Sequence, residues 1–273
     1  MRLHSLLTAY LAWLSVLLAA PLQAVAQEQD SAGINIVVPA DTVLPGQKAP
    51  FTDAQRLEAS DKRFLRRAVL PSAVLIAAGV YTYGGRGILS SNDVFDYRNQ
   101  TFPDFGTKAD DFAMFAPLVG LYGFNLISPL NRHKLGRQTV LFFSAVGVTS
   151  AIVGPTKLTT SIERPNGEPY AFPSGHTAYA FTIATFMDKE FRHTSPWISV
   201  VSYGIAGGTG VLRVLNNEHW MSDVLAGAGV GVLSVNMVYW VHAKLTEGGG
   251  LNTAVVPVVL PNGSPGVGMY LQF

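Results

Sequence analysis

From residue 64 onward the chain alternates long apolar stretches with short polar segments. The apolar stretches cover residues 69–83, 112–130, 139–154, 178–187, 197–212 and 224–241. Stretches of this kind predict helices, and several are near the short end of what crosses a bilayer, so each fits either a buried core helix or a membrane span. The pattern predicts an all-α fold, which we interpret as a membrane-associated helical bundle of about five or six core helices.

The beginning of the chain has the pattern of an export signal. Arg2 and His4 precede an apolar run over residues 6–20, and small residues follow it at 24–26. This order of charged, apolar and small residues predicts a signal peptide over residues 1–26, which is removed by cleavage. An uncleaved anchor helix is the alternative, although the apolar run is short for a membrane span.

The rest of the chain divides into three parts. Residues 27–60 contain scattered prolines and no sustained period, which indicates an extended N-terminal arm. Residues 61–247 hold the apolar stretches and form the helical domain. In residues 248–273 two β-rich runs flank Asn262-Gly263, a dipeptide typical of tight turns, so we expect a small C-terminal β-hairpin there.

Basic loops predict how the helices cross the membrane. Residues 131–137 and 188–193 are rich in basic side chains, and positive-inside bias assigns both to the cytoplasm. If the helices alternate in direction, the loops at 156–172 and 214–222 emerge together on the periplasmic side. The acid-rich segment 84–111 falls on that same side.

A cleaved signal peptide conflicts with this topology. Cleavage leaves the mature N-terminus outside, and six spans from there would place the loops at 156–172 and 214–222 in the cytoplasm. We therefore expect that the first apolar stretch, at 69–83, does not fully cross the membrane. A wholly soluble periplasmic helical protein is the alternative solution.

Composition and charge narrow the class of protein. Hydrophobic residues make up 48% of the chain and charged residues only 14%, as expected of a chain that buries most of itself. The formal net charge is +1 and no lysine- or arginine-rich run is present, so we expect no nucleic-acid partner. The chain contains no cysteine, which excludes disulfides, cysteine nucleophiles and thiolate metal sites.

Three basic side chains point to phosphate chemistry. They are Lys157, Arg164 and Arg213. Arginine presents a planar fork that matches phosphate oxygens, and lysine adds a compact charge, so together they could bind a phosphate and stabilise charge in its transition state. Taken singly, each also fits a cation that flanks a membrane span.

A second group of residues has the features of a helix start. Pro173 cannot extend an upstream helix, Ser174 is a good N-cap, and Gly175 lets the backbone approach a ligand closely. A helix that begins here directs its free amides at an anion, and His176 in its first turn could protonate a leaving oxygen. An ordinary helix cap with an incidental histidine is the alternative.

The third group is a histidine with a carboxylate four residues later. His219 and Asp223 share one face if the last helix begins by His219. A histidine nitrogen can attack phosphorus when the other ring nitrogen donates to a carboxylate. Alternatively, Asp223 caps the helix together with Ser222, and His219 belongs with Trp220 to an interfacial belt. We expect no metal site, because no second carboxylate accompanies His219.

These groups form three signatures in the chain: Lys157-x6-Arg164-Pro165, Pro173-Ser174-Gly175-His176 and Arg213-x5-His219-x3-Asp223. In this order they resemble the three signatures of the type 2 phosphatidic acid phosphatase superfamily, over roughly residues 139–242. That family also includes soluble class A acid phosphatases and vanadium haloperoxidases. One departure is Leu212, where the third signature usually has a serine; a hydroxyl is lost, but every charged group remains.

The resemblance implies a metal-independent phosphomonoesterase. His219 would attack phosphorus to give a phosphohistidine intermediate, Asp223 would orient it, and His176 would protonate the leaving oxygen. Water would then hydrolyse the intermediate. The phosphate would be bound by Lys157, Arg164, Arg213, Ser174 and the amide of Gly175.

The surrounding sequence is most similar to bacterial envelope lipid phosphatases, lipid A phosphatases among them. The expected substrate is therefore a phosphorylated lipid of the phosphatidate, lipid A or isoprenyl type, handled without a cofactor. The expected location is the inner membrane of the cell envelope, with a periplasm-facing active site. Alternatives are a soluble periplasmic non-specific acid phosphatase, a haloperoxidase-like enzyme, or a non-catalytic lipid-binding member of the fold. The oligomeric state is left open.

Overall fold

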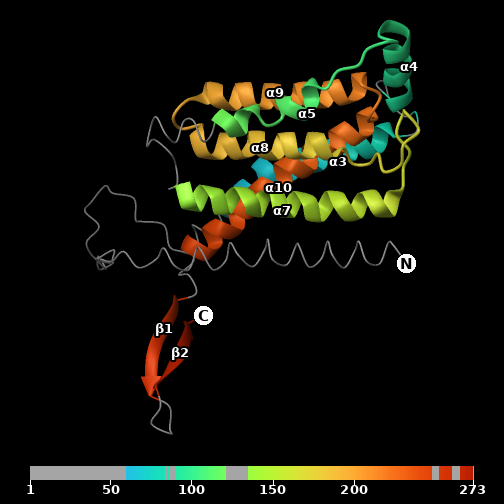
Figure 1. Ribbon diagram of the computed structural model, residues 1–273. Coiled ribbons are helices and arrows are strands. Elements are labelled where there is room, and N and C mark those ends of the chain that lie inside the picture. The colour runs from blue at the N-terminus through green and yellow to red at the C-terminus, as the bar shows by residue number, and fades with distance from the viewer. Residues whose placement is uncertain are drawn as a thin grey trace.

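The structure, a computed structural model, describes residues 60–83, 85, 90–120, 135–247, 252–259 and 265–272. Its centre is formed by α7 (Leu135–Thr160), α8 (Gly175–Phe191), α9 (Pro196–Leu215) and α10 (Met221–Glu247). Long helices run side by side, and α4 (Ser91–Thr101) lies across one end of them (Figure 1). The predicted all-α bundle is confirmed, whereas the predicted signal peptide at 1–26 lies outside the described residues.

The innermost helix is α8. Most of its 17 residues are buried, because α7, α9 and α10 all pack against it. Interhelical hydroxyl pairs add to this packing: Thr149 Oγ1 lies 2.8 Å from Thr182 Oγ1, and the Tyr203 hydroxyl donates to Thr185 Oγ1 at 3.0 Å. Such pairs satisfy polar groups where no water is available. The surrounding helices therefore fix where α8 begins.

Two glycines let α10 cross α8 at very short range. A Cβ atom added at Gly227 would lie 2.6 Å from the carbonyl oxygen of Ser174, and one added at Gly231 would lie 2.9 Å from the backbone nitrogen of Thr182. Real Cβ atoms do not approach backbone this closely, so only glycine permits the crossing. The start of α8 is thereby held against α10.

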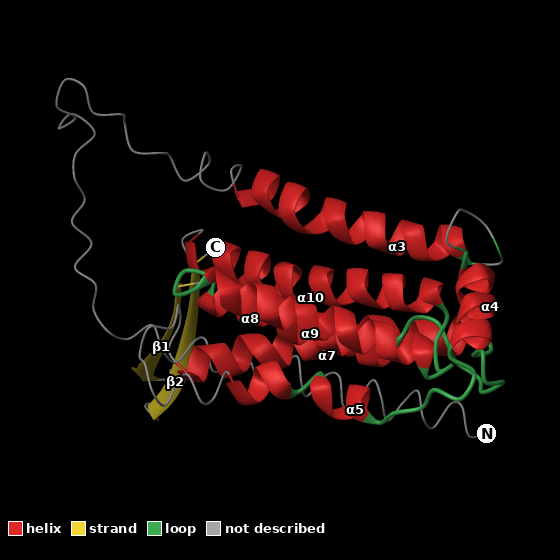
Figure 2. Ribbon diagram, turned by 90° about the horizontal axis from the view of Figure 1, so that it is seen from above, coloured by secondary structure: helices red, strands yellow, loops and turns green. Residues whose placement is uncertain are grey.

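The first helix of the domain is longer than its apolar stretch. It runs over Ser60–Thr82 and includes η2 (Leu65–Val69) and α3 (Leu70–Thr82). Figure 2 shows α3 alongside α10. Near one end Lys244 Nζ pairs with Asp61 Oδ1 at 2.9 Å, and near the other a Cβ atom at Gly79 would lie 2.6 Å from the Ser222 carbonyl oxygen.

These contacts correct the expectation for the stretch at 69–83. The helix lies antiparallel along almost the whole of α10, and both are long and apolar enough to cross a membrane. The apolar pattern did not predict the first turns of this helix, because four basic residues, at 62, 63, 66 and 67, interrupt the apolar run. The conflict between a cleaved signal peptide and a periplasmic site is therefore not removed by a short first helix.

In the part of the chain that the structure describes, four helices are long and apolar enough to cross a membrane: Ser60–Thr82, Leu135–Thr160, Pro196–Leu215 and Met221–Thr246. Their outer surfaces expose large apolar side chains, including Val74 at 67% and Trp197 at 72%. Apolar side chains gathered in this way would be unfavourable in water and are favourable against lipid. The surface thus favours a membrane-embedded bundle over a soluble periplasmic protein.

Between the first helix and α7, the described residues include the short helices α4 and α5 (Ala109–Ala113). Ser90 begins α4 with a capping box, in which its hydroxyl accepts from the Asp93 amide and the Asp93 carboxylate accepts from the Ser90 amide. The predicted apolar helix at 112–130 falls partly on residues 121–134, outside the described residues.

The C-terminal segment contains two strands, β1 (Asn252–Val259) and β2 (Pro265–Gln272). They pair antiparallel, with Asn252 opposite Gln272 and Val259 opposite Pro265. This is the segment in which the sequence indicates a hairpin, and the pair is a minor addition to an otherwise helical chain.

Candidate active site

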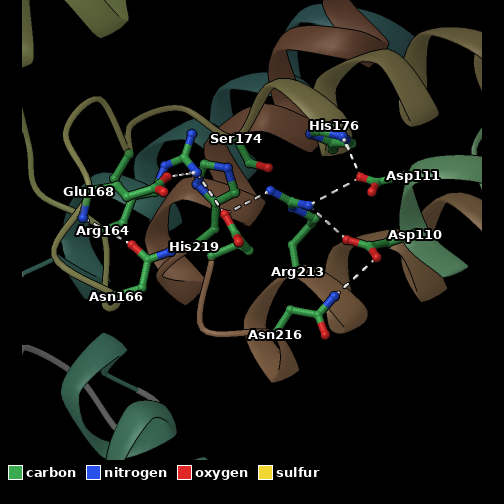
Figure 3. Close-up of polar contacts among 12 residues, drawn as sticks. Asp110, Asp111, Arg164, Asn166, Glu168, Ser174, His176, Arg213, Asn216 and His219 are labelled. Atoms are coloured by element: carbon green, nitrogen blue, oxygen red, sulfur yellow. Dashed lines mark hydrogen bonds and ion pairs between the residues drawn. The ribbon is translucent and has the colours of Figure 1, made fainter. Parts of the chain in front are cut away.

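Figure 3 shows Arg164, Ser174, His176, Arg213 and His219, five of the residues predicted to carry the chemistry, on helix ends and loops. Lys157 lies in the last turn of α7 and Arg213 in the last turn of α9, while Asp223 lies in the first turn of α10. As the alternation of helices predicts, the loops at 156–172 and 214–222 emerge at one end. Lys157 is on a helix, because α7 continues to Thr160.

His219 and Asp223 form a buried pair. His219 Nδ1 lies 3.2 Å from Asp223 Oδ2, and the two residues are 2% and 0% exposed. Asp223 Oδ2 also accepts from the Trp220 amide at 2.9 Å, and Asp223 Oδ1 accepts from Ser222 Oγ at 3.3 Å. A carboxylate can only accept, so we assign the imidazole proton to Nδ1. The lone pair of His219 Nε2 is then available as a nucleophile.

The helix start differs from the one assumed in the sequence argument. α10 begins at Met221, so His219 precedes it. The pair is made instead by a turn in which the Glu218 and His219 amides both donate to the Arg213 carbonyl, and in which Asn217 has a left-handed φ of 61°. One carboxylate oxygen, Asp223 Oδ2, thus contacts both the backbone amide before α10 and the His219 ring.

Burial keeps His219 neutral. It lowers the pKa of His219 from 6.5 to about 4, and the positive charges of Lys157 and Arg213 act in the same direction. The hydrogen bond and negative charge of Asp223 oppose this shift without cancelling it. A neutral imidazole is the nucleophilic form, so at neutral pH His219 has the protonation state that its predicted role requires.

Two arginines meet at one carboxylate oxygen. Glu218 Oε2 accepts from Arg164 NH1 at 2.6 Å and from Arg213 NH2 at 3.2 Å. Glu168 Oε2 accepts from the same Arg164 NH1 at 2.9 Å. Because Glu218 is the neighbour of His219 in the chain, the arginines converge beside the candidate nucleophile.

Each of these arginines also has a buried N–H group without a hydrogen-bond acceptor among the described residues. Among the described residues, Arg164 Nε and Arg213 Nε are buried without a hydrogen-bond partner. Buried N–H groups are normally paired, since leaving one unsatisfied costs about 1–3 kcal/mol. A site with two such donors and an anionic oxygen between the guanidinium groups has the donor set for a phosphate.

Lys157 lies beside the start of α8. A Cβ atom at Gly175 would lie 3.9 Å from Lys157 Cε. Lys157 Nζ donates to the carbonyl oxygens of Tyr170 at 2.5 Å and Ala171 at 3.3 Å, so its ammonium group is held by the loop before α8.

Ser174 caps α8 as predicted. Its side chain is 0% exposed and accepts from the Thr177 amide at 3.4 Å and from Thr177 Oγ1 at 3.0 Å. The Ser174 amide donates to the Asp223 carbonyl at 3.0 Å. The helix start that carries Gly175 and His176 is therefore tied to the residue that orients His219.

His176 has an acidic partner that the sequence did not indicate. Its Nε2 atom lies 3.1 Å from Asp111 Oδ1, and Asp111 also lies 3.5 Å from Arg213 NH1. Figure 3 shows Arg213 between the Asp111 and Asp110 carboxylates on one side and the His219 ring on the other. Burial lowers the pKa of His176 and the Arg213 charge acts in the same direction, whereas the Asp111 carboxylate opposes this shift by stabilising the protonated ring.

Other residues of the site were missed by the sequence argument. Asp110 Oδ2 accepts from Arg213 NH1 at 2.8 Å, and Asp110 Oδ1 accepts from Asn216 Nδ2 at 3.0 Å. The only available signal was that the acid-rich segment 84–111 falls on the side of the site. Nothing in the spacing distinguishes Asp110 and Asp111 from the other acids there.

Two more contacts hold the loops of the site together. Arg98 Nε donates to the Leu215 carbonyl at 2.8 Å and Arg98 NH2 to the Phe105 carbonyl at 3.0 Å, which ties the α4–α5 segment to the end of α9. Trp220 Nε1 donates to the Glu163 carbonyl at 2.8 Å. Trp220 therefore joins the Arg164 loop to the His219 turn, in addition to any interfacial role.

No group of three or more histidine, aspartate or glutamate residues in the described part of the chain is placed to hold a metal ion. The chemistry available from the described side chains is that of a nucleophilic imidazole, a second imidazole with a carboxylate, and three cations.

Residues 148–247 match the model of the PAP2 superfamily. Lipid A 1-phosphatase of Porphyromonas gingivalis is 32% identical over 179 residues, 65% of this chain and 39% of that protein. Bacitracin transport permease protein BcrC of Bacillus licheniformis is 37% identical over 76 residues, 28% of this chain and 36% of that protein. The chain thus spans about two fifths of the length of the curated relatives it matches.

Two solved structures are also similar. The crystal structure of Aquifex aeolicus LpxE matches with a TM-score of 0.42 and 20% identity, over 53% of this chain and 93% of that one. The first transmembrane PAP2 type phosphatidylglycerolphosphate phosphatase from Bacillus subtilis matches with a TM-score of 0.45 and 18% identity, over 70% of this chain and 97% of that one.

The matched family segment contains the whole set of predicted site residues, from Lys157 to Asp223. The resemblance of the three signatures is therefore matched by the family model over the same segment. Over residues 148–247 the chain is therefore similar to the PAP2 superfamily.

Proposed function

We propose that the protein is a metal-independent phosphatase, which removes phosphate from a lipid-linked phosphomonoester or diphosphate through a phosphohistidine intermediate. The observation that carries the proposal is the meeting of Arg164 and Arg213 at a single Glu218 oxygen beside His219. A phosphate oxygen carries the same charge and accepts the same donors, so it can replace the carboxylate between the two guanidinium groups.

The reaction follows from the site's proton positions. The lone pair of His219 Nε2 attacks phosphorus while the bond to the leaving oxygen breaks, and His176 gives that oxygen a proton. Asp223 stabilises the positive imidazole that results. Water then attacks the phosphohistidine, His176 takes the proton from it, and inorganic phosphate leaves with His219 restored. The cations, with Ser174 and the Gly175 amide, stabilise the charge on the phosphoryl oxygens.

The surrounding helices support a lipid substrate. The site lies at the ends of helices that are long and apolar enough to cross a membrane, so acyl or isoprenyl chains could stay in the bilayer while the headgroup reaches His219. One curated relative is named as a lipid A 1-phosphatase. Phosphate release should therefore be measured on phosphatidate, phosphatidylglycerol phosphate, undecaprenyl diphosphate and lipid A, with a soluble aryl phosphate as the comparison.

The mechanism is tested by replacing the nucleophile. His219→Ala should reduce turnover by at least about 1,000-fold and abolish acid-labile radiolabel taken from substrate phosphate. His242→Ala, near the opposite end of α10, is the matched control and should keep both. Vanadate should inhibit the wild-type protein, and EDTA should have little effect, because side chains supply the positive charge. Turnover by His219→Ala near the wild-type rate, or activity lost in EDTA and restored by a divalent ion, would refute the mechanism.

A further inference from the structure

A large cavity lies near the end of the bundle opposite the candidate active site. Its volume is about 1030 Å³, and it is lined by Arg67, Thr185, Asp188, Lys189, Arg192, His193, Tyr203, Val232 and Asn236. These residues come from the first helix, α8, α9 and α10 and from the loop after α8. None of them belongs to the phosphatase site, so the cavity is a separate feature.

One face of α8 supplies most of the polar wall. Thr185, Asp188, Lys189 and Arg192 follow one another at intervals of three, one and three residues, which places them on a single helix face. Arg67 approaches from the first helix. The cationic side chains are thus presented to one space by two helices that are far apart in sequence.

The rim of the cavity carries an excess of positive charge. Arg67, Lys189 and Arg192 are opposed there by one acid, Asp188. The Arg192–Asp188 pair is loose, at 3.5 Å, and the Arg192 side chain is 70% exposed. Three cations outnumber the one acid, so the rim has a net positive charge that can attract an anion.

The deeper wall differs from the rim. Its polar side chains have partners within the protein. The Tyr203 hydroxyl donates to Thr185 Oγ1 at 3.0 Å, and Asn236 Nδ2 donates to the backbone carbonyl of Val232 at 2.8 Å. Val232 lies near the middle of α10 (Met221–Glu247), so at about 1.5 Å per residue the cavity extends well into the depth of a bilayer. The cationic rim is suited to the anionic headgroup of a lipid, and the wall that reaches the middle of α10 is suited to the start of an acyl chain.

We propose that this cavity binds the phosphate headgroup and part of one acyl chain of an anionic membrane phospholipid, which is not the substrate. The volume slightly exceeds the roughly 300–1,000 Å³ typical of ligand pockets and is more than a free phosphate ion needs. Basic pockets between membrane helices are suited to such headgroups. The site is independent of the catalytic proposal, because it shares no residue with it.

The proposal is tested by photo-crosslinking in lipid nanodiscs that contain equal amounts of phosphatidylglycerol and phosphatidylcholine. A benzoylphenylalanine at Tyr203, which lines the cavity, should capture phosphatidylglycerol at least about fivefold over phosphatidylcholine. The same probe at Trp197, which is 72% exposed on α9, reports the surrounding lipid and should capture both in the bulk ratio. Capture in the bulk ratio at Tyr203 would overturn the proposal.

A second measurement uses charge variants of the full chain with the Tyr203 probe in place. Arg67→Gln with Arg192→Gln should bring the phosphatidylglycerol preference down to the bulk ratio. Arg66→Gln, an exposed neighbour that does not line the cavity, should keep it. Inorganic phosphate at millimolar concentration should not compete. Loss of the preference in Arg66→Gln as well, or displacement of the lipid by free phosphate, would overturn the proposal.

Discussion

At the scale of single residues, opposed effects set the pKa of the His219 imidazole. Burial lowers the pKa of His219 to about 4 against the pull of Asp223. Protonation is therefore disfavoured in the folded protein until the pH falls well below the ordinary histidine range. The proposed nucleophile, His219, should therefore remain neutral across the whole neutral and mildly acidic pH range.

This gives a prediction for the pH profile. With an activated aryl phosphate, kcat/KM divided by the fraction of substrate dianion should stay level from about pH 8 to about pH 5 and fall near pH 4, because His219 is protonated only there. The measurement should be repeated in His176→Ala, which removes the other histidine of the site. A fall centred on the ordinary histidine pKa of 6.5 in that variant would contradict the role given to burial.

The second histidine is tested through the leaving group. His176→Ala should slow a poor alkyl leaving group by about 100-fold or more and an activated aryl leaving group far less, because only the alkoxide needs a proton. Asp111→Asn should show the same leaving-group dependence more weakly, since Asp111 acts through the 3.1 Å contact with His176 Nε2. Equal losses on both substrates would indicate that His176 has only a structural part.

At the scale of elements, the crossing of α8 and α10 fixes the site's geometry. The start of α8 carries His176, and the start of α10 carries Asp223. Gly227 and Gly231 allow the two helices to touch backbone to backbone just behind these residues. A change in the spacing of the helices would therefore separate the proposed acid from the proposed nucleophile.

Gly231→Ala should destabilise the protein by about 1–3 kcal/mol, because its Cβ would press on the backbone of Thr182. The stability is measured by thermal unfolding in detergent. Gly208→Ala in α9 is the matched control: a Cβ there has nothing within 4 Å, so the unfolding temperature should be unchanged or slightly raised. Equal effects of the two variants would argue against a close helix crossing.

At the scale of the whole molecule, the two ends of the bundle differ in charge. The end near the start of the first helix carries Lys62, Arg63, Arg66 and Arg67, together with Lys189, Arg192 and Lys244. The opposite end holds the acids of the α4–α5 segment and the proposed site. Positive-inside bias predicts that the first of these ends lies in the cytoplasm and the site in the periplasm.

Because the first helix lies along α10, this orientation predicts the side of its N-terminal end. A cysteine at Asn166 should react with a membrane-impermeant maleimide in intact spheroplasts, whereas cysteines at Lys62 and Gly136 should react only after permeabilisation. The chain contains no native cysteine to interfere. Labelling of Lys62 together with protection of Asn166 would reverse the orientation.

The same experiment decides between two sequence predictions. A mature chain that begins outside at Gln27 and enters the membrane directly through Ser60–Thr82 would place Lys62 outside and Asn166 inside. A periplasmic site requires the opposite result. For a chain that enters the membrane directly at Ser60, a cleaved signal peptide and a periplasmic site are therefore alternatives.

The sequence by itself determined the features that depend on neighbours in the chain. The apolar pattern predicted the helices, Pro173 and Ser174 predicted the start of α8, and the four-residue spacing of His219 and Asp223 predicted their pairing. These features are local, so short-range geometry and periodicity are enough to indicate them. Even where α10 began two residues later than assumed, the pair formed.

Only the tertiary structure decided which distant residues complete the site and how far the first helix extends. Asp110 and Asp111 reach Arg213 from more than 100 positions away, and Glu218 becomes informative only when Arg164 lies beside it. The basic residues at 62–67 interrupt the apolar pattern, so the sequence did not predict the first turns of the helix that packs on α10. Such contacts have no periodic signal in the sequence, because they arise from the way the helices pack together, and packing depends on all of the helices at once.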